Sequence, residues 1–162
     1  MPPASYNDFF IACIGASASF IGLLFVAISV VLSRSDAGKG TAELEFTDRR
    51  LAESAFMALV DIFFVSLQAI MPSSNIGYVA IVMGILGIRS AFRIFSYRKE
   101  TGAVLWLIGS ILIYGFQITY SILLILHPTN IGDIDAIATL IMILFGSSLI
   151  RAWELTGIRK KG

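Results

Sequence analysis

Three polar side chains recur along one otherwise apolar segment of the chain. Glu53, Asp61 and Gln68 are separated by 8 and 7 residues within the segment 51–71. These spacings are close to whole numbers of helical turns, so the three side chains share one stripe of a helix. Asp61 lies at the middle of the segment. An ionisable group at the centre of a membrane costs about 2.5–3.5 kcal/mol to insert, so Asp61 requires a polar partner or a function.

A second polar stripe follows the segment 103–126. Its members recur at 4, 7 and 11 residues from the first, and they are Ser110, Tyr114, Gln117 and Ser121. Counting residues from the expected ends of the segments places Asp61 level with Tyr114 and Ser147, and Gln117 within one turn. Buried Tyr and Gln side chains need partners in lipid as much as carboxylates do. We therefore expect this stripe to face the Asp61 stripe.

A charged layer lies nearer to one end of the same segments. It contains five residues: Glu53, Arg89, Arg93, Arg151 and Glu154. Arg89 and Arg93 are four residues apart and share one face of a helix, as Glu53 and Asp61 do on theirs. The spacing predicts two salt bridges, one between Arg89 and Asp61 and one between Arg93 and Glu53.

These charges have three interpretations. In the first, the ion pairs only hold helices together, and Arg151 pairs locally with Glu154 at a spacing of three. In the second, Asp61 is a protonation or cation site, and the arginines with Glu53 form a gate on the cytoplasmic side. In the third, Arg93 and Arg151 extend to the membrane interface and need no partner.

The elements that must position these residues are membrane-length helices. The chain has 162 residues, of which 57% are hydrophobic and 14% charged, whereas an ordinary soluble domain carries about 25% charged residues. Five apolar runs are each long enough to cross a bilayer, and they span about 9–32, 51–71, 76–97, 103–126 and 135–156. We predict an all-α integral membrane bundle, with residues 1–162 as a single transmembrane domain and 33–50 as a cytoplasmic loop.

Local signals delimit these helices. The residues 72–75, which begin with Pro72, are typical of a tight turn between two antiparallel helices. Thr47 followed by Asp48 predicts the start of the second helix. Asp133 and Asp135 are the corresponding candidates for the fifth helix.

The composition excludes several classes of protein. A net charge of +1 excludes a strongly basic nucleic-acid binder. Cys13 is the only cysteine, which excludes a disulfide framework. The only histidine, His127, lies beside Pro128 in an expected outer loop, so neither a multi-histidine metal site nor a Ser/His/Asp arrangement can form inside the membrane. We therefore expect no enzyme, no cofactor and no metal site.

Small residues form smooth faces on two of the expected helices. One face contains Gly15, Ser19, Gly22 and Ser29, and the other contains Ala80, Gly84, Gly87 and Ala91. In lipid such faces let helix backbones approach closely, within one subunit or between subunits. A single bundle of this size encloses little volume, so we expect a homo-oligomer. A pathway lined by backbone is the alternative interpretation.

The first of these faces carries a resemblance. The stretch from Gly15 to Ser29, GASASFIGLLFVAIS, resembles the first span of small bacterial membrane proteins that are sometimes labelled modulators of a membrane protease. The resemblance covers one span, about a tenth of the chain, and transfers no binding or catalytic residue. It implies a protein that binds or regulates another membrane complex.

Two functions are therefore expected from the sequence. The first is a homo-oligomeric ion channel or transporter of the bacterial inner membrane, with membrane lipids around it, an ion as its substrate and Asp61 as its central site. Tyr114 and Gln117 would be the hydrogen-bonding neighbours of that site. The alternative is a non-conducting interaction or regulatory protein. An enzyme acting on lipid has less support, because no nucleophile and base pair is visible.

The direction of the chain across the membrane follows from its basic residues. All 12 Lys and Arg residues lie in the loop 33–50 or at the ends of the third and fifth spans. Threading five spans alternately places these regions on one side, which the positive-inside rule makes cytoplasmic. A reporter fused after Gly162 should therefore be cytoplasmic, and one inserted in the loop 127–134 external. A reporter at residue 162 that is found outside would overturn this topology.

Overall fold

The computed structural model describes residues 4–35, 42–71, 75–95, 101–128 and 130–155. Regular structure in these ranges is entirely helical. The five helices are α1 (Ala4–Ser35), α2 (Ala42–Ile70), α3 (Ile76–Phe95), α4 (Thr101–Leu126) and α5 (Ile131–Leu155). Each contains a stretch long and apolar enough to cross a membrane. The predicted all-α fold with five membrane-length helices is therefore confirmed.

Helix α2 begins earlier than predicted. It starts at Ala42, inside the segment expected to be a loop, and runs past Thr47 without interruption. No Gly or Pro occurs between Gly40 and Ile70, so no residue in this stretch opposes helix formation. The expected turn 72–75 lies mostly outside the described residues.

Helix α5 also begins earlier than Asp135. Asn130 precedes it and acts as the cap: its Oδ1 accepts from the backbone N–H of Gly132 at 3.1 Å, and its Nδ2 donates to Asp133 Oδ2 at 3.0 Å. The first of these bonds satisfies a backbone donor that the first turn leaves free, and the second holds the Asn130 amide in place. Asp133 therefore supports the start of the helix, whereas Asp135 lies inside it and accepts a hydrogen bond from Tyr6 on α1.

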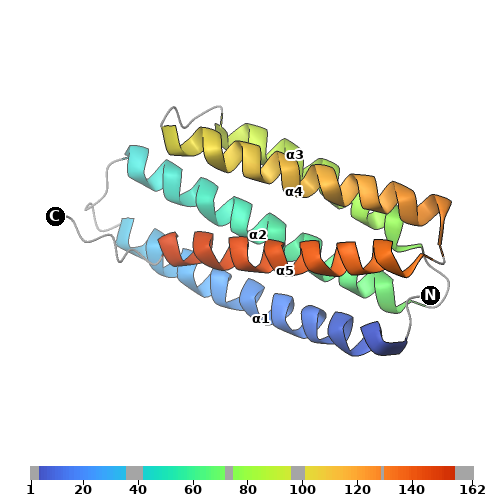
Figure 1. The fold of residues 1–162 in the computed structure, drawn as a ribbon. Coiled ribbons are helices and arrows are strands. Elements are labelled where there is room, and N and C mark those ends of the chain that lie inside the picture. Colours follow the sequence, from blue (N-terminus) through green and yellow to red (C-terminus); the bar gives the residue numbers. More distant parts are fainter. Residues whose placement is uncertain (1–3, 36–41, 72–74, 96–100, 129, 156–162) are drawn as a thin grey trace.

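Four of the helices pack in a ring, in which each contacts the next. Helix α2 contacts α3, α3 contacts α4, α4 contacts α5, and α5 contacts α2, and the four lie as two antiparallel pairs (Figure 1). The starts of α1, α3 and α5 lie at one end of the bundle, which we call the His127 end. The starts of α2 and α4 lie at the opposite end, near Arg151, which we call the Arg151 end.

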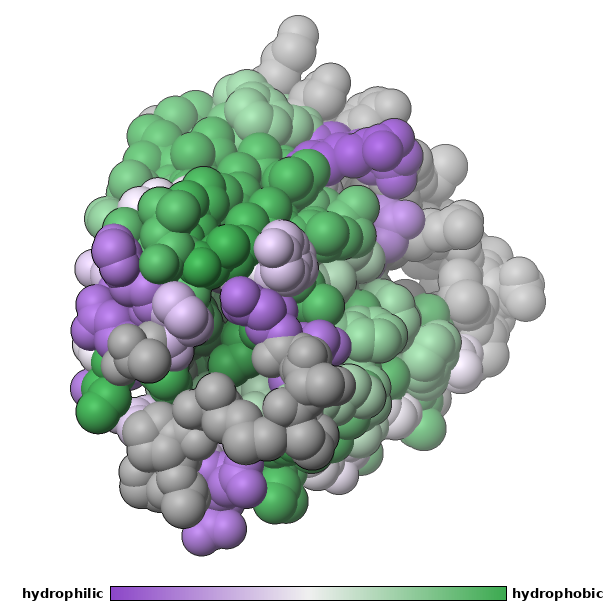
Figure 2. All heavy atoms as spheres, turned by 90° about the vertical axis from the view of Figure 1, so that its right-hand side faces the viewer, coloured by the Kyte–Doolittle hydropathy of each residue, from purple (hydrophilic) through white to green (hydrophobic). Residues whose placement is uncertain are grey.

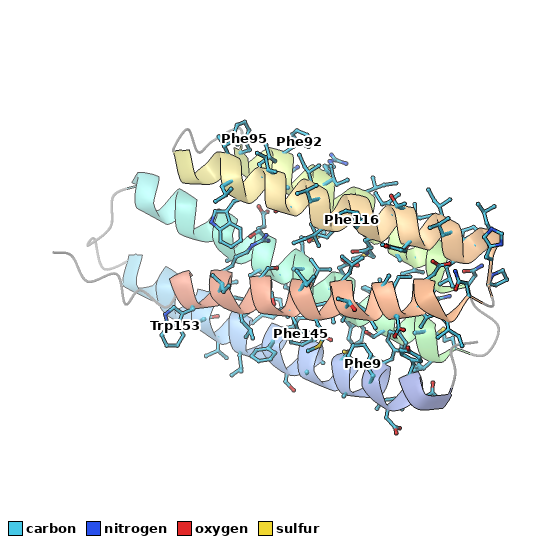
Figure 3. The ribbon with its side chains drawn as sticks, viewed as in Figure 1. Phe9, Phe92, Phe95, Phe116, Phe145 and Trp153 are labelled. Carbon is cyan, nitrogen blue, oxygen red and sulfur yellow. The ribbon has the colours of Figure 1, made fainter. Side chains whose placement is uncertain are left out.

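Helix α1 packs on the outside of this ring, against α2 and α5 (Figure 1). Edge-to-face aromatic pairs mark both contacts: Phe25 and Phe56 have ring centroids 5.6 Å apart, and Phe20 and Phe145 have theirs 5.7 Å apart. Figure 3 shows Phe145 between α5 and α1. Helix α2 therefore lies in the middle of the bundle. It packs against α1 on one side and against α3 and α5 of the ring on the other.

The closest helix packing is between α3 and α4, because α3 presents glycines to α4. A Cβ atom added at Gly77 would lie 2.6 Å from the backbone oxygen of Ser121, and one added at Gly84 would lie 2.7 Å from Ile118 Cγ1. One added at Gly87 would overlap the ring of Tyr114. The predicted packing face on this helix is confirmed for Gly84 and Gly87. The absence of side chains lets the two backbones meet, as is typical of membrane helices.

The outer surface of the bundle is apolar along its length. Large apolar side chains stand exposed on every helix, among them Leu105 at 75% and Trp153 at 69% exposure, and Figure 3 shows Phe92 and Phe95 pointing away from the neighbouring helices. Figure 2, which looks onto the His127 end, shows hydrophilic residues gathered in separate patches beside apolar flanks. Such a surface is typical of a multi-pass membrane protein.

The glycine contact predicts the effect of a single methyl group. Gly77→Ala should lower the free energy of unfolding by about 1–3 kcal/mol, because the new Cβ would press on backbone that cannot rotate away. Gly115→Ala on α4 is the matched control, since nothing lies within 4 Å of a Cβ there. It should leave stability unchanged or raise it by up to about 1 kcal/mol. Unfolding in SDS titrations measures both, and equal values for the two variants would contradict the close contact.

Candidate functional site

Asp61 lies inside the ring, at the centre of the apolar stretch of α2. It is the tenth of the 19 residues in the apolar stretch Ala52–Ile70, and only 1% of its surface is exposed. Small and apolar residues surround it on its own helix, including Ala58, Ile62 and Val65, which are also buried. Because this face of α2 packs against the other helices, the carboxyl group of Asp61 is carried into the interior of the ring.

The side chain of Gln117 on α4 holds this carboxyl group. Its Nε2 donates one hydrogen bond to Asp61 Oδ1 at 2.9 Å and a second to the backbone oxygen of Ala80 at 3.1 Å. Both partners are acceptors, so this orientation of the amide is the one that gives two hydrogen bonds. One amide group thereby connects α2, α3 and α4. The predicted apposition of the two polar stripes is confirmed for Asp61 and Gln117, whereas Glu53 is exposed and Gln68 half-buried.

Two buried oxygen atoms at this contact have no hydrogen-bond partner. They are Asp61 Oδ2 and Gln117 Oε1, and both are acceptors of side chains that are at most 3% exposed. A buried polar atom without a partner costs about 1–3 kcal/mol, and more when it is charged. The site therefore combines a firmly held carboxyl group with an unmet need for a hydrogen-bond donor or a positive charge.

Tyr114 lies one turn from Gln117 towards the Arg151 end. Its side chain is buried at 3% exposure, and its ring rests on the backbone of α3 at Gly87. It lies within electrostatic range of both Asp61 and Arg151. Tyr114 thus places a polar side chain between Asp61 and Arg151.

Arg151 on α5 forms a second polar layer about two turns from Asp61. Its guanidinium group donates to the backbone oxygen of Ser54 on α2 at 3.4 Å and to Ser110 Oγ on α4 at 3.3 Å. It also lies 5.4 Å from the ring centroid of Trp106, within the range of a cation–π contact. This layer uses the same faces of α2 and α4 as the contact of Asp61 with Gln117. Ser54 precedes Asp61 by seven residues, and Ser110 precedes Gln117 by seven, which is about two helical turns.

The ring is more apolar towards the His127 end. Buried residues there come from all four helices: Val65, Ile76, Leu124, Ile137 and Ile141. Ser121 is buried among them, and its hydroxyl donates to the backbone oxygen of Gln117 at 2.6 Å. The polar interior of the ring therefore extends from Asp61 mainly towards the Arg151 end.

Some of the predicted site residues meet at Asp61 in the structure, and the others lie apart from it. It brings Asp61, Gln117 and Tyr114 together, with Ser121 behind them. Ser147 is half-buried on α5, and its hydroxyl donates to the backbone oxygen of Leu144. Gln68 is half-buried nearer the His127 end, and the side chain of Glu154 lies outside the described part.

The predicted ion pair between Arg89 and Asp61 is wrong. Arg89 and Arg93 are both exposed on α3, and Asp61 is held by Gln117 instead. The glycine face of α3 lies against α4, and Arg89 follows Gly87 by two residues, or about 200° around the helix. Arg89 therefore points away from the ring. Glu53 is exposed as well, and its pairing with Arg93 stays a prediction.

Two partners of the site were missed in the sequence. Ser54 binds Arg151 through its backbone oxygen, and Ala80 binds Gln117 in the same way, and a backbone acceptor has no sequence signature. A signal for Ser54 existed nevertheless, since it precedes Asp61 by the same seven residues that separate Asp61 from Gln68.

No family model, no curated protein and no solved structure matches this chain. The resemblance of its first span to modulators of a membrane protease stays a prediction. Among the described residues, no group of three or more His, Cys, Asp and Glu side chains could hold a metal ion. The chemistry of Asp61 and its neighbours is therefore the basis for assigning a function.

The Gln117 contact predicts a measurable coupling to Asp61. Gln117→Met should lower the free energy of unfolding by about 1–3 kcal/mol, because it leaves the carboxyl group buried without a donor. The double variant Asp61→Leu with Gln117→Met should lose less than the sum of the two single variants. Thr119→Val is the control, since Thr119 is exposed on the same helix and bonds only its own backbone. Additive losses in SDS titrations would contradict the coupling.

Proposed function

We propose that the protein is a homo-oligomeric channel or transporter of the cell membrane, which binds a proton or a small cation at Asp61 and passes it across the bilayer. One observation carries the proposal. Asp61 Oδ2 is buried at the middle of a membrane-length helix without a hydrogen-bond partner. Carboxyl groups that face the interior of a membrane bundle are typical of proton relays and ion pathways.

The polar interior supplies a route from Asp61 towards the Arg151 end. Tyr114 and Ser110 offer hydroxyl groups along α4, and Arg151 with Trp106 covers the end of this route. Arg151 donates hydrogen bonds to α2 and to α4 from its place on α5. It therefore bridges three helices across the end of the route, which suits a gate. This gate takes the role first expected of Arg89, Arg93 and Glu53.

The apolar half of the ring favours a transporter over an open channel. Ions do not cross a packed layer such as Val65, Leu124 and Ile141 unless the helices move. A site at the centre of the membrane, covered on both sides, suits alternating exposure to the two sides. The basic residues near the Arg151 end support placing that end in the cytoplasm, and we propose the bacterial inner membrane as the location.

The surface of α1 supports the homo-oligomer. Gly15, Ser19 and Gly22 are exposed, and nothing lies within 4 Å of a Cβ added at either glycine. The space beside the α3 glycines is occupied by α4, whereas no described residue occupies the space beside Gly15 and Gly22. The face of α1 can therefore take a helix of another copy.

The groups available for a reaction are few in the part of the chain that the structure describes. Cys13 is buried on α1, and His127 is exposed at the end of α4. Neither lies beside the Asp61 site. We therefore propose transport without a cofactor rather than catalysis.

A non-conducting interaction protein is the second candidate. The exposed small face of α1 favours it, because the same face could bind a helix of a different membrane protein. On this alternative the contact between Asp61 and Gln117 only holds the ring together. Both candidates use the same surface, so the chemistry of Asp61 discriminates between them.

Transport in liposomes tests the proposal. Purified protein should dissipate an imposed pH, Na⁺ or K⁺ gradient, and Asp61→Asn should lower the rate to that of protein-free liposomes, because an amide can neither take up a proton at neutral pH nor bind a cation as a carboxylate does. Asp8→Asn is the matched control, since Asp8 is exposed near the start of α1. Dyes sensitive to pH or to the ion measure both rates.

Two results would contradict transport. The first is the absence of flux under every gradient and voltage in liposomes that contain folded protein. The second is a flux that Asp61→Asn leaves unchanged. A membrane partner that copurifies at fixed stoichiometry with both the wild type and Asp61→Asn, in a protein without flux, would establish the second candidate instead.

A further inference from the structure

We propose that the species bound at Asp61 is a single proton, which resides on Oδ2 and is shared with Oε1 of Gln117. The inference rests on the proposed function and names its substrate. It starts from the two oxygen atoms of the site that have no partner, Asp61 Oδ2 and Gln117 Oε1. Both are acceptors, and they belong to the two side chains that are already joined through Gln117 Nε2 and Asp61 Oδ1.

One proton answers the needs of both atoms. The ionised carboxylate takes up a proton from water at Oδ2 and becomes a neutral carboxyl group, whose O–H can donate to Oε1. The amide and the carboxyl group would then exchange two hydrogen bonds, with Nε2 donating to Oδ1 and Oδ2 donating to Oε1. A water molecule could also donate to the two oxygens, but it would leave the buried negative charge uncompensated.

The donor set is too small for a metal ion. Hard cations such as Mg²⁺ and Ca²⁺ take about six to eight oxygen ligands, whereas the contact of Asp61 and Gln117 offers two free oxygens. In the described part of the chain, a third buried side-chain oxygen without a hydrogen-bond partner is Ser66 Oγ. Ser66 follows Asp61 by five residues, so it points about 140° away around α2. A proton needs only one acceptor pair, and the site provides it.

The charged and titratable groups around Asp61 agree with a proton. From α4 the titratable neighbour is Tyr114, and from α5 the charged group is Arg151, which is bonded to Ser54 two turns away. From α3 the site receives the carbonyl group of Ala80, while Arg89 of that helix is exposed. From α1 the titratable residue that faces the core is Cys13.

None of these groups is a cation placed against the carboxyl group. The proton itself is therefore the neutralising charge. Loss of the proton would leave an anion that requires hydration, which favours opening of the ring at the Arg151 end, where the polar side chains of Tyr114, Ser110 and Arg151 lie. Proton binding and the closed ring are thus coupled in this proposal.

Infrared difference spectroscopy of the protein in lipid bilayers tests the inference at neutral pH, where exposed carboxyl groups are ionised. The wild type should show one protonated-carboxyl C=O band that shifts in ²H₂O. Asp61→Asn should lack this band, and Asp8→Asn should keep it. Adding Na⁺, K⁺ or Mg²⁺ at constant pH should leave it unchanged.

A second variant covers the case in which Asp61→Asn does not fold. Gln117→Leu removes the acceptor of the proposed O–H bond and should move the band to higher frequency. The inference is overturned by a wild type without the band, by a band that Na⁺, K⁺ or Mg²⁺ abolishes, or by a band that Gln117→Leu does not move.

This measurement separates the inference from the proposed function. The band reports proton binding without any transport. A band that behaves as expected in a protein without flux would support the proton site and refute transport. A Na⁺ or K⁺ flux that depends on Asp61, in a protein that lacks the band, would support transport and refute the proton as its substrate.

Discussion

The amide of Gln117 gives hydrogen bonds to a carboxyl group of α2 and to a carbonyl group of α3, and the architecture of the ring depends on this contact. Lipid contributes no hydrophobic force between helices, so association in a membrane comes from packing and from polar groups that have no other partner. Asp61 cannot face lipid without a large cost. It therefore fixes which face of α2 turns inward, and α1 covers the opposite face.

The glycines of α3 determine how far the ring can close. Because Gly77 and Gly84 have no side chains, α4 approaches the backbone of α3, and Gln117 reaches the carbonyl oxygen of Ala80. A bulkier α3 would hold this amide away from α3, leaving it bonded to Asp61 alone. Packing and polar chemistry thus support each other: the smooth face supplies the proximity, and the amide uses it.

Much of this arrangement could be predicted from the sequence. The predictions that were wrong, such as the ion pair of Arg89, failed for a geometrical reason. The apolar runs predict the five helices because length and composition decide what can cross a bilayer. The spacing of Asp61 and of Gln117 predicts their contact. Counting residues estimates the depth of Arg89 in the bundle, but depth does not fix the direction of a side chain around its helix. That direction depends on the glycine contact with α4. The spacing of Ser54 and Asp61 places Ser54 on the stripe of Asp61, but it does not show that the backbone oxygen of Ser54 binds Arg151.

The order in which the chain is synthesised constrains how its helices assemble. Gln117 follows Asp61 by 56 residues, so at about 5–20 residues per second the ribosome supplies it roughly three to eleven seconds later. During that interval α2 has left the tunnel while its carboxyl group has no amide to meet. The nascent helix must therefore stay beside α1 or within the insertion machinery until α4 emerges, and the rate of translation sets the length of that stay.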